Sequence, residues 1–179
     1  MLEDYDVNDL RRQIAVVSQQ PVLFNMSIRE NIAYGHLGDV SDTEIYRAAQ
    51  LAHVHDFVMS LPKGYDTQLG DSASLISGGQ AQRLQFARAL LSDRRILLLD
   101  ECTSALDAKN SEAVMRTISN VKVGRSMIVI THKLDVMKLC DRIIVLQDGR
   151  VVEQGPMLDL LGRANSVFAS LAKGGIWSD

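Results

Sequence analysis

ILLLDE, residues 96 to 101, is the stretch that decides the fold of this chain. Its apolar run, Ile96 to Leu99, is typical of a strand that is buried on both faces of a parallel sheet. A second apolar run, Met127 to Ile130, follows a polar segment that we predict to be helical over about Ser111 to Asn120. Strand, helix and strand in this order predict a right-handed βαβ unit. The fold class is therefore α/β.

Two carboxylates stand at the end of the first strand. Asp100 would lie at the carboxyl edge of the sheet, where α/β proteins bind their ligands. In phosphoryl-transfer enzymes such an aspartate holds Mg²⁺. The adjacent Glu101 leaves the strand in another direction and could accept a proton from an attacking water. Taken alone, the pair fits equally well with any leucine-rich strand that ends in acidic residues.

Upstream of this unit the pattern predicts short elements. Val7 to Gln13 reads as a polar helix, Ile14 to Ser18 as an extended run, and a loop opens at Gln19. Residues 65 to 77 have the composition of a loop, and the next helix is expected from about Gly79 to Ser92.

A further helix is expected in the middle of this region. Ser41 and Glu44 have the S-x-x-E spacing of a capping box, in front of an apolar helical pattern. The helix should end by Leu61, because Pro62 cannot continue it.

The last third of the chain predicts a hairpin and a helical tail. Arg142 to Leu146 and Val151 to Gln154 flank Asp148-Gly149, which is a strong turn signal. The tail after Gly155 is expected to be helical and to dock on the body through its apolar residues, namely Leu158, Leu160, Leu161, Val167, Phe168 and Leu171.

ISGGQ, residues 76 to 80, is a candidate anion site. Glycines that open a helix let its backbone N–H groups approach a negative charge, which the helix dipole favours. Ser77 adds a hydroxyl group. By itself GGQ is a weak signal, and such a segment is more often a glycine-rich loop before a well-capped helix. His132, after the second strand, and Gln19, in a loop, are each more often structural than catalytic.

Bulk properties exclude some classes of protein. The net charge of −3, with no run rich in Lys or Arg, gives no reason to expect nucleic acid as a partner. Cys102 and Cys140 form no CxxC pair and fit a reducing cytosol better than a disulfide scaffold. No stretch of this chain has the roughly 20 apolar residues that a transmembrane helix needs.

Order and spacing together are more specific than any one motif. Four segments occur in sequence, with Asp100 following Gly79 by 21 positions and His132 following Asp100 by 32. They are VVSQQ (16–20), ISGGQAQRLQFARALL (76–91), ILLLDECTSALD (96–107) and VITH (129–132). Over about Asp6 to Gly155 the chain resembles the ATP-binding-cassette (ABC) family.

The resemblance assigns a role to each motif residue. It implies ATP and Mg²⁺ as ligands, held by a P-loop NTPase-like, mostly parallel sheet core with an α-helical signature subdomain. The implied positions are Gln19 for the Q-loop, Ser77, Gly78, Gly79 and Gln80 for the signature motif, Asp100 for the Walker B aspartate, Glu101 for the catalytic glutamate, Asp107 for the D-loop and His132 for the switch histidine.

The resemblance also implies partners and subdomains. A second ABC ATPase domain would pair head to tail, so that each ATP contacts the signature helix of the other domain. SQQPVLFNMSIRENIAYG and LPKGYDTQLG look most like exporters of drugs or peptides, whose ATPase acts at the cytoplasmic face of a membrane on a transmembrane domain. The expected subdomains are 20–93 (helical), 1–19 with 94–155 (core) and 156–179 (tail).

The chain departs from the family pattern in three places. No GxxxxGK[ST] phosphate loop occurs in it, and the first core strands are missing, so we expect a fragment, a truncated gene model or half of something larger, with an exposed sheet edge. Ile76 replaces the usual leucine, which is nearly isosteric. Asp71-Ser72-Ala73 replaces Glu-Arg-Gly, which predicts altered coupling between domains.

Two functions remain open on the sequence, and two others fit it less well. The first is the ATPase domain of an exporter. The second is a non-catalytic partner or fragment that presents only its signature motif to the ATP of another domain. A chromosome-organising or DNA-repair ATPase is disfavoured, because the interval from Gln19 to Ser77 is too short for a long coiled coil and no heptad run occurs. A soluble translation-associated cassette would not explain the exporter-like segments.

Overall fold

The computed structural model describes residues 5–70, 76–103, 106–121 and 124–173, with the side chains of residues 108 and 109 left out. It divides into two compact units, Met1–Ile130 and Thr131–Asp179. Each is considered by itself. In the described ranges, none of the helices has the length and apolar character that crossing a bilayer requires.

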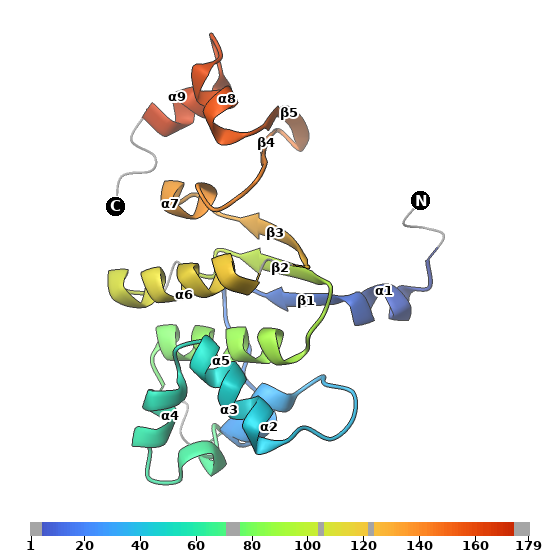
Figure 1. Ribbon diagram of the computed structural model, residues 1–179, viewed down its shortest axis with the longest axis vertical. Coiled ribbons are helices and arrows are strands. Elements are labelled where there is room, and N and C mark those ends of the chain that lie inside the picture. Colours follow the sequence, from blue (N-terminus) through green and yellow to red (C-terminus); the bar gives the residue numbers. More distant parts are fainter. Residues whose placement is uncertain (1–4, 71–75, 104–105, 122–123, 174–179) are drawn as a thin grey trace. The chain divides into compact units, whose positions relative to one another are not determined.

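A parallel sheet forms the centre of the first unit (Figure 1). Its strands are β1 (Ile14–Val17), β2 (Ile96–Asp100) and β3 (Ser126–Ile130), in the order β1-β2-β3. Helix α6 (Ala108–Val121) connects β2 to β3, which pair in parallel register. The predicted strand, helix and strand are therefore confirmed.

The two faces of this sheet differ in burial. Leu97 and Leu99 are fully buried in the core, whereas Val16, Ile128 and Ile130 are about half exposed, at 49%, 55% and 51%. The prediction that β2 is buried on both faces is therefore wrong for the described residues, because the core packs against one face only. In the described part of the chain β1 and β3 each pair with β2 alone, which leaves the expected open edges.

The first unit also contains the helices α1 (Val7–Gln13), α2 (Ile28–Ala33), α3 (Asp42–Leu51), α4 (His55–Ser60), the short 3₁₀ helix η2 (Gly64–Asp66) and α5 (Gly78–Leu91). Helices α2, α3 and α5 each begin with a capping box. The predicted helices at Val7 and Gly79 are confirmed, the second starting one residue earlier.

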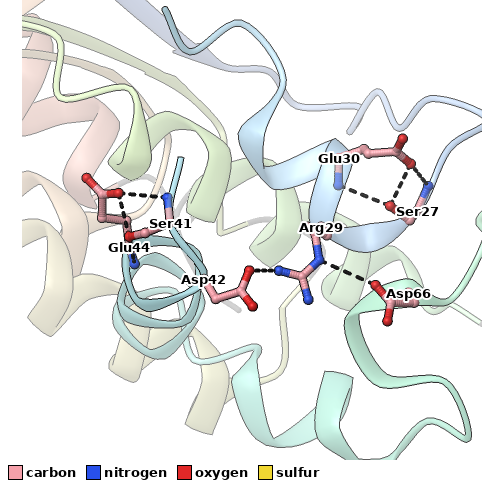
Figure 2. A network of polar contacts seen from close by, with 7 residues as sticks. All are labelled: Ser27, Arg29, Glu30, Ser41, Asp42, Glu44 and Asp66. Atoms are coloured by element: carbon pink, nitrogen blue, oxygen red, sulfur yellow. Dashed lines mark hydrogen bonds and ion pairs between the residues drawn. The ribbon is translucent and has the colours of Figure 1, made fainter. Parts of the chain in front are cut away.

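Figure 2 shows two of these capping boxes, at Ser27 and Ser41. In each, the serine side chain accepts from the N–H of the glutamate three residues on, whose carboxylate accepts from the serine N–H in return. The box at Ser41 was predicted. The one at Ser27 starts α2, which sequence reasoning missed although Ser27 and Glu30 have the same S-x-x-E spacing. Arg29 then pairs with Asp42 and Asp66, which joins α2 to the start of α3 and to η2.

The helix that we expect to end by Leu61 ends ten residues earlier, at Leu51, and α4 follows as a separate helix. His53 adopts the left-handed conformation, with φ of 53°. The Val54 N–H bonds the Ala49 carbonyl at 2.9 Å, and the His53 N–H bonds the Gln50 carbonyl at 3.0 Å. This pair of bonds is a Schellman motif. The break between α3 and α4 was not predicted, because histidine replaces the glycine that usually marks such an end.

The second unit is a hairpin with helices packed on it. Its elements are α7 (Leu134–Met137), β4 (Ile143–Gln147), β5 (Arg150–Gly155), α8 (Met157–Gly162) and α9 (Val167–Lys173). The predicted hairpin is confirmed, because β4 and β5 pair antiparallel around Asp148 and Gly149, both with positive φ. The helical tail is confirmed as well. Leu160 and Phe168 are buried as expected, but Leu158 is 82% exposed and does not dock.

Glu153 on β5 holds the start of α9, and this predicts an effect of pH. Its carboxylate accepts from the backbone N–H groups of Phe168 and Val167 at 3.0 and 2.9 Å and from the Ser166 hydroxyl at 2.9 Å. These bonds, the one from Phe168 foremost, lower the pKa of Glu153. The stabilisation is therefore present above the unfolded pKa of about 4.3 and is lost as the pH falls through the lower folded value.

We expect faster amide exchange at Val167 and Phe168 when the pH is lowered through the folded pKa of Glu153, once intrinsic exchange is corrected for. Glu153→Gln should give the faster exchange at neutral pH already and remove the acid-dependent part. Asp159→Asn, at an exposed acid of α8, is the matched control. Exchange that is equally protected in Glu153→Gln would contradict the capping role.

Candidate functional site

The ends of β1 and β2 bring Gln19 and Glu101 together. Because these strands are parallel neighbours, the segments that follow them leave the sheet at the same edge. The Gln19 side-chain amide donates a hydrogen bond to the Glu101 carboxylate, with 2.7 Å between Nε2 and Oε2. Two residues that lie 82 positions apart in the sequence thus meet at the predicted edge.

Glu101 has an unusual backbone. Its φ is 45°, in the left-handed region that residues other than glycine rarely adopt. The N–H of Glu101 donates to the Ile130 carbonyl at the end of β3, at 2.9 Å. Such a conformation costs about 1–3 kcal/mol and is concentrated at functional sites. Glu101 is therefore held by β3 through its backbone and by Gln19 through its side chain.

The oxygen atoms of the side chains at this edge are suitable ligands for an Mg²⁺ ion that also binds phosphate. Asp100 is half-buried at the end of β2, and the Gln19 amide keeps its oxygen available while its nitrogen binds Glu101. No group of three or more His, Cys, Asp or Glu residues that could hold a metal by itself occurs in the described ranges. Mg²⁺ typically takes one or two carboxylates together with substrate phosphates and waters. The residues present fit that pattern.

The start of α5 is exposed to solvent at Ser77 and Gly78. The Ser77 hydroxyl accepts from the Gln80 N–H, and the Gln80 side chain accepts from the Ser77 N–H at 2.8 Å. Ser77 and Gln80 thus cap their own helix. The N–H groups of Gly78 and Gly79 have no partner within the helix, since they belong to its first turn. Backbone donors at this exposed helix start are suited to an anion.

Asp107 lies before α6 in the chain, and His132 follows β3. The Asp107 carboxylate accepts from the Asn110 N–H at 2.9 Å and from the Asn110 side chain at 2.6 Å, which is a capping arrangement at the start of α6. His132 lies at the beginning of the second unit, half-exposed. Its convergence with Glu101 stays a prediction, as does contact of Asp107 with nucleotide. Asp71-Ser72-Ala73 lies outside the described residues, whereas Ile76 packs against the core.

Two residues that sequence reasoning missed attach the loop after Gln19 to α5. The Gln85 side chain donates to the Ser18 hydroxyl at 2.9 Å. One turn later the Arg88 guanidinium donates to the Val22 carbonyl at 2.9 Å. Both ends of the loop are thus attached to the helix that begins at Ser77.

Arg88 also organises the residues around it. It donates to the Asn31 carbonyl at 2.7 Å and to the Asn31 side-chain oxygen at 3.0 Å. Its guanidinium lies 5.1 Å from the centre of the Phe24 ring and 5.7 Å from that of Tyr34. Burial lowers the pKa of Arg88. The only sequence signal was an arginine between Ala87 and Ala89 on a mostly buried helix.

Comparison with known proteins shows the family of this chain. The family model described as ABC transporter matches residues 1–104. The chain is 45% identical over 167 residues to the multidrug resistance protein sirA of Leptosphaeria maculans, covering 93% of this chain and 13% of that protein. It is 44% identical over 167 residues to the ATP-dependent lipid A-core flippase of Acinetobacter baylyi, covering 93% and 29%.

A solved structure is similar as well. It is that of a bacterial Atm1-family ABC exporter with ATP bound, with a TM-score of 0.86 and 41% identity over 92% of this chain and 29% of that one. The chain thus spans less than a third of the length of these relatives. Identity at this level over nearly the whole chain, a matching family model and the same fold leave one assignment: this chain belongs to the ABC transporter family.

Proposed function

We propose that this chain is the greater part of an ATP-binding and ATP-hydrolysing domain that powers transmembrane export. The observation that carries the proposal is the hydrogen bond from Gln19 to Glu101 at the carboxyl edge of the parallel sheet. A general base needs an orienting partner, and an amide donor orients a carboxylate without removing its ability to take a proton. The exposed start of α5 supports the same reading.

Each residue then has a chemical role. Water attacks the terminal phosphorus of ATP, the bond from that phosphorus to the bridging oxygen of the departing ADP breaks, and the proton of the water passes to Glu101. Asp100 and Gln19 would hold Mg²⁺, which would supply positive charge against the phosphates. His132 would contact the terminal phosphate, as the family resemblance implies.

The partners follow from the same resemblance. Ser77, Gly78, Gly79, Gln80 and Asp107 would meet ATP bound by a second ABC ATPase domain, in a head-to-tail dimer. A transmembrane domain would receive the conformational change of the ATPase domains. The chain would then lie at the cytoplasmic face of a membrane. The lipid A-core flippase and the Atm1-family exporter among the similar proteins support an exporter.

A chimeric exporter tests this function. The matching segment of the bacterial Atm1-family exporter is replaced by this chain, and hydrolysis of Mg-ATP is measured on the purified protein in detergent. We expect turnover within roughly tenfold of a typical enzyme value of about 10 s⁻¹. A folded, assembled chimera that binds ATP without hydrolysing it would overturn the proposal.

A second candidate is a non-catalytic partner that presents only its signature helix. The exposure of Ser77 and Gly78 favours it as much as it favours the first. In that case the chimera would be inactive when all its ATPase domains carry this chain, yet a mixed dimer with one unmodified domain would still hydrolyse ATP. The two assemblies, compared side by side, separate the candidates.

A further inference from the structure

Arg83 joins three elements of the first unit. It lies on α5, one turn after Gln80, and is half-buried. Its guanidinium donates to the side-chain oxygen of Asn110 on α6 and, at 3.0 Å, to the carbonyl of His53 at the end of α3. One side chain therefore connects the helix that begins at Ser77 to the C-terminus of α3 and to the first turn of α6.

Asn110 passes this connection on to Asp107. Its amide oxygen is used by Arg83, and its amide nitrogen donates to the Asp107 carboxylate at 2.6 Å. The Asn110 N–H bonds the other carboxylate oxygen at 2.9 Å. Three side chains thus form a continuous path from α5 to the residue that precedes α6.

The other end of the cluster is fixed as well. His53 contacts the hydroxyl of Thr117 on α6 at 3.2 Å, and Thr117 donates to the Leu51 carbonyl at 2.7 Å. The negative charge of Asp107 offsets part of the desolvation that lowers the pKa of Arg83. Both bonds of Arg83 come from one guanidinium nitrogen, Nη1, so the His53 carbonyl and the Asn110 side chain are held by a single group.

We propose that Arg83 and Asn110 are positioning residues that lock the segment carrying Asp107 to the helix that begins at Ser77. The two segments that would face the ATP of another domain then move as one piece. This inference rests on the proposed function for its effect on turnover, and on the hydrogen bonds alone for its structural effect.

The test uses the chimeric exporter with Arg83→Met, Asn110→Ala and the double variant. Each single variant should lower kcat for ATP roughly tenfold and change KM less than about twofold, because positioning rather than ground-state binding is lost. The double variant should be no slower than the slower single variant, since both changes break the same link. Arg116→Met, at an exposed arginine of α6, is the matched control and should stay within about twofold.

Asn110→Asp separates positioning from folding. It keeps an acceptor for Arg83 but loses the donor to Asp107 and places a second carboxylate against it. We expect melting behaviour close to that of the parent and kcat as low as in Asn110→Ala. Additive losses in the double variant, or parent-like kcat in Asn110→Asp, would overturn the proposal.

Hydrogen exchange gives a readout that needs no turnover. Arg83→Met should speed amide exchange in the first turn of α6, around Asn110 and Ser111, and Arg116→Met should not. Unchanged exchange there refutes the link whether or not the chimera hydrolyses ATP. An inactive parent chimera with the expected exchange pattern would defeat the proposed function and leave the link standing.

Discussion

Glu101→Gln should lower ATP hydrolysis by the chimeric exporter about 10²- to 10⁴-fold, the range that a general base contributes. The substitution removes the proton acceptor but retains an oxygen that can accept the hydrogen bond from Gln19, now 2.7 Å from the carboxylate. Fold and ATP binding should therefore persist. Steady-state phosphate release gives the rate, and equilibrium binding of radiolabelled ATP verifies that the site still fills.

The matched control is Glu112→Gln, which makes the same chemical change at an exposed residue of α6 that pairs with Arg116 on the surface. Its activity should stay within about twofold of the parent, since such surface pairs contribute little. If Glu101→Gln hydrolyses ATP as fast as this control, Glu101 is not the base and the assignment of the catalytic carboxylate fails.

Arg88→Met is expected to destabilise the first unit by about 3 kcal/mol. The change leaves the Asn31 carbonyl without this donor, whereas the Asn31 side-chain oxygen keeps the Phe24 N–H and the Val22 carbonyl is open to water. A buried acceptor that loses its partner costs about 1–3 kcal/mol, and some relaxation toward water offsets the sum. The stacking of the guanidinium over Phe24 and Tyr34 is lost as well.

Urea unfolding of the chimera measures this loss of stability. The quantity compared is the urea concentration at the midpoint of the transition in which the first unit unfolds. Arg47→Met on α3 is the control, because that side chain is exposed and should change stability by less than about 0.5 kcal/mol. Arg88→Lys should fall between the two, since it keeps the charge but loses the planar fork. Equal midpoints for Arg88→Met and Arg47→Met would show that Arg88 does not hold the loop.

Local signals in the sequence predicted most of the elements correctly. The strand that ends at Asp100, the hairpin around Asp148 and the capping box at Ser41 each depend on residues within a few positions of one another. The interactions that form these elements can therefore be recognised from a short segment of the sequence. The end of α3 at His53 was missed because its Schellman motif lacks the glycine by which such ends are recognised. Helix α2 was missed although its capping signal was present at Ser27.

The sequence by itself determined the α/β class, because apolar periodicity and turn residues are properties of neighbouring residues, and its resemblance to known sequences indicated the family. Only the tertiary structure decided that Gln19 bonds Glu101 and that Arg88 and Arg83 tie α5 to the loop and to α6. These contacts join residues between 27 and 82 positions apart. Their partners are selected by strand pairing and helix packing, which bring together groups that no local pattern relates.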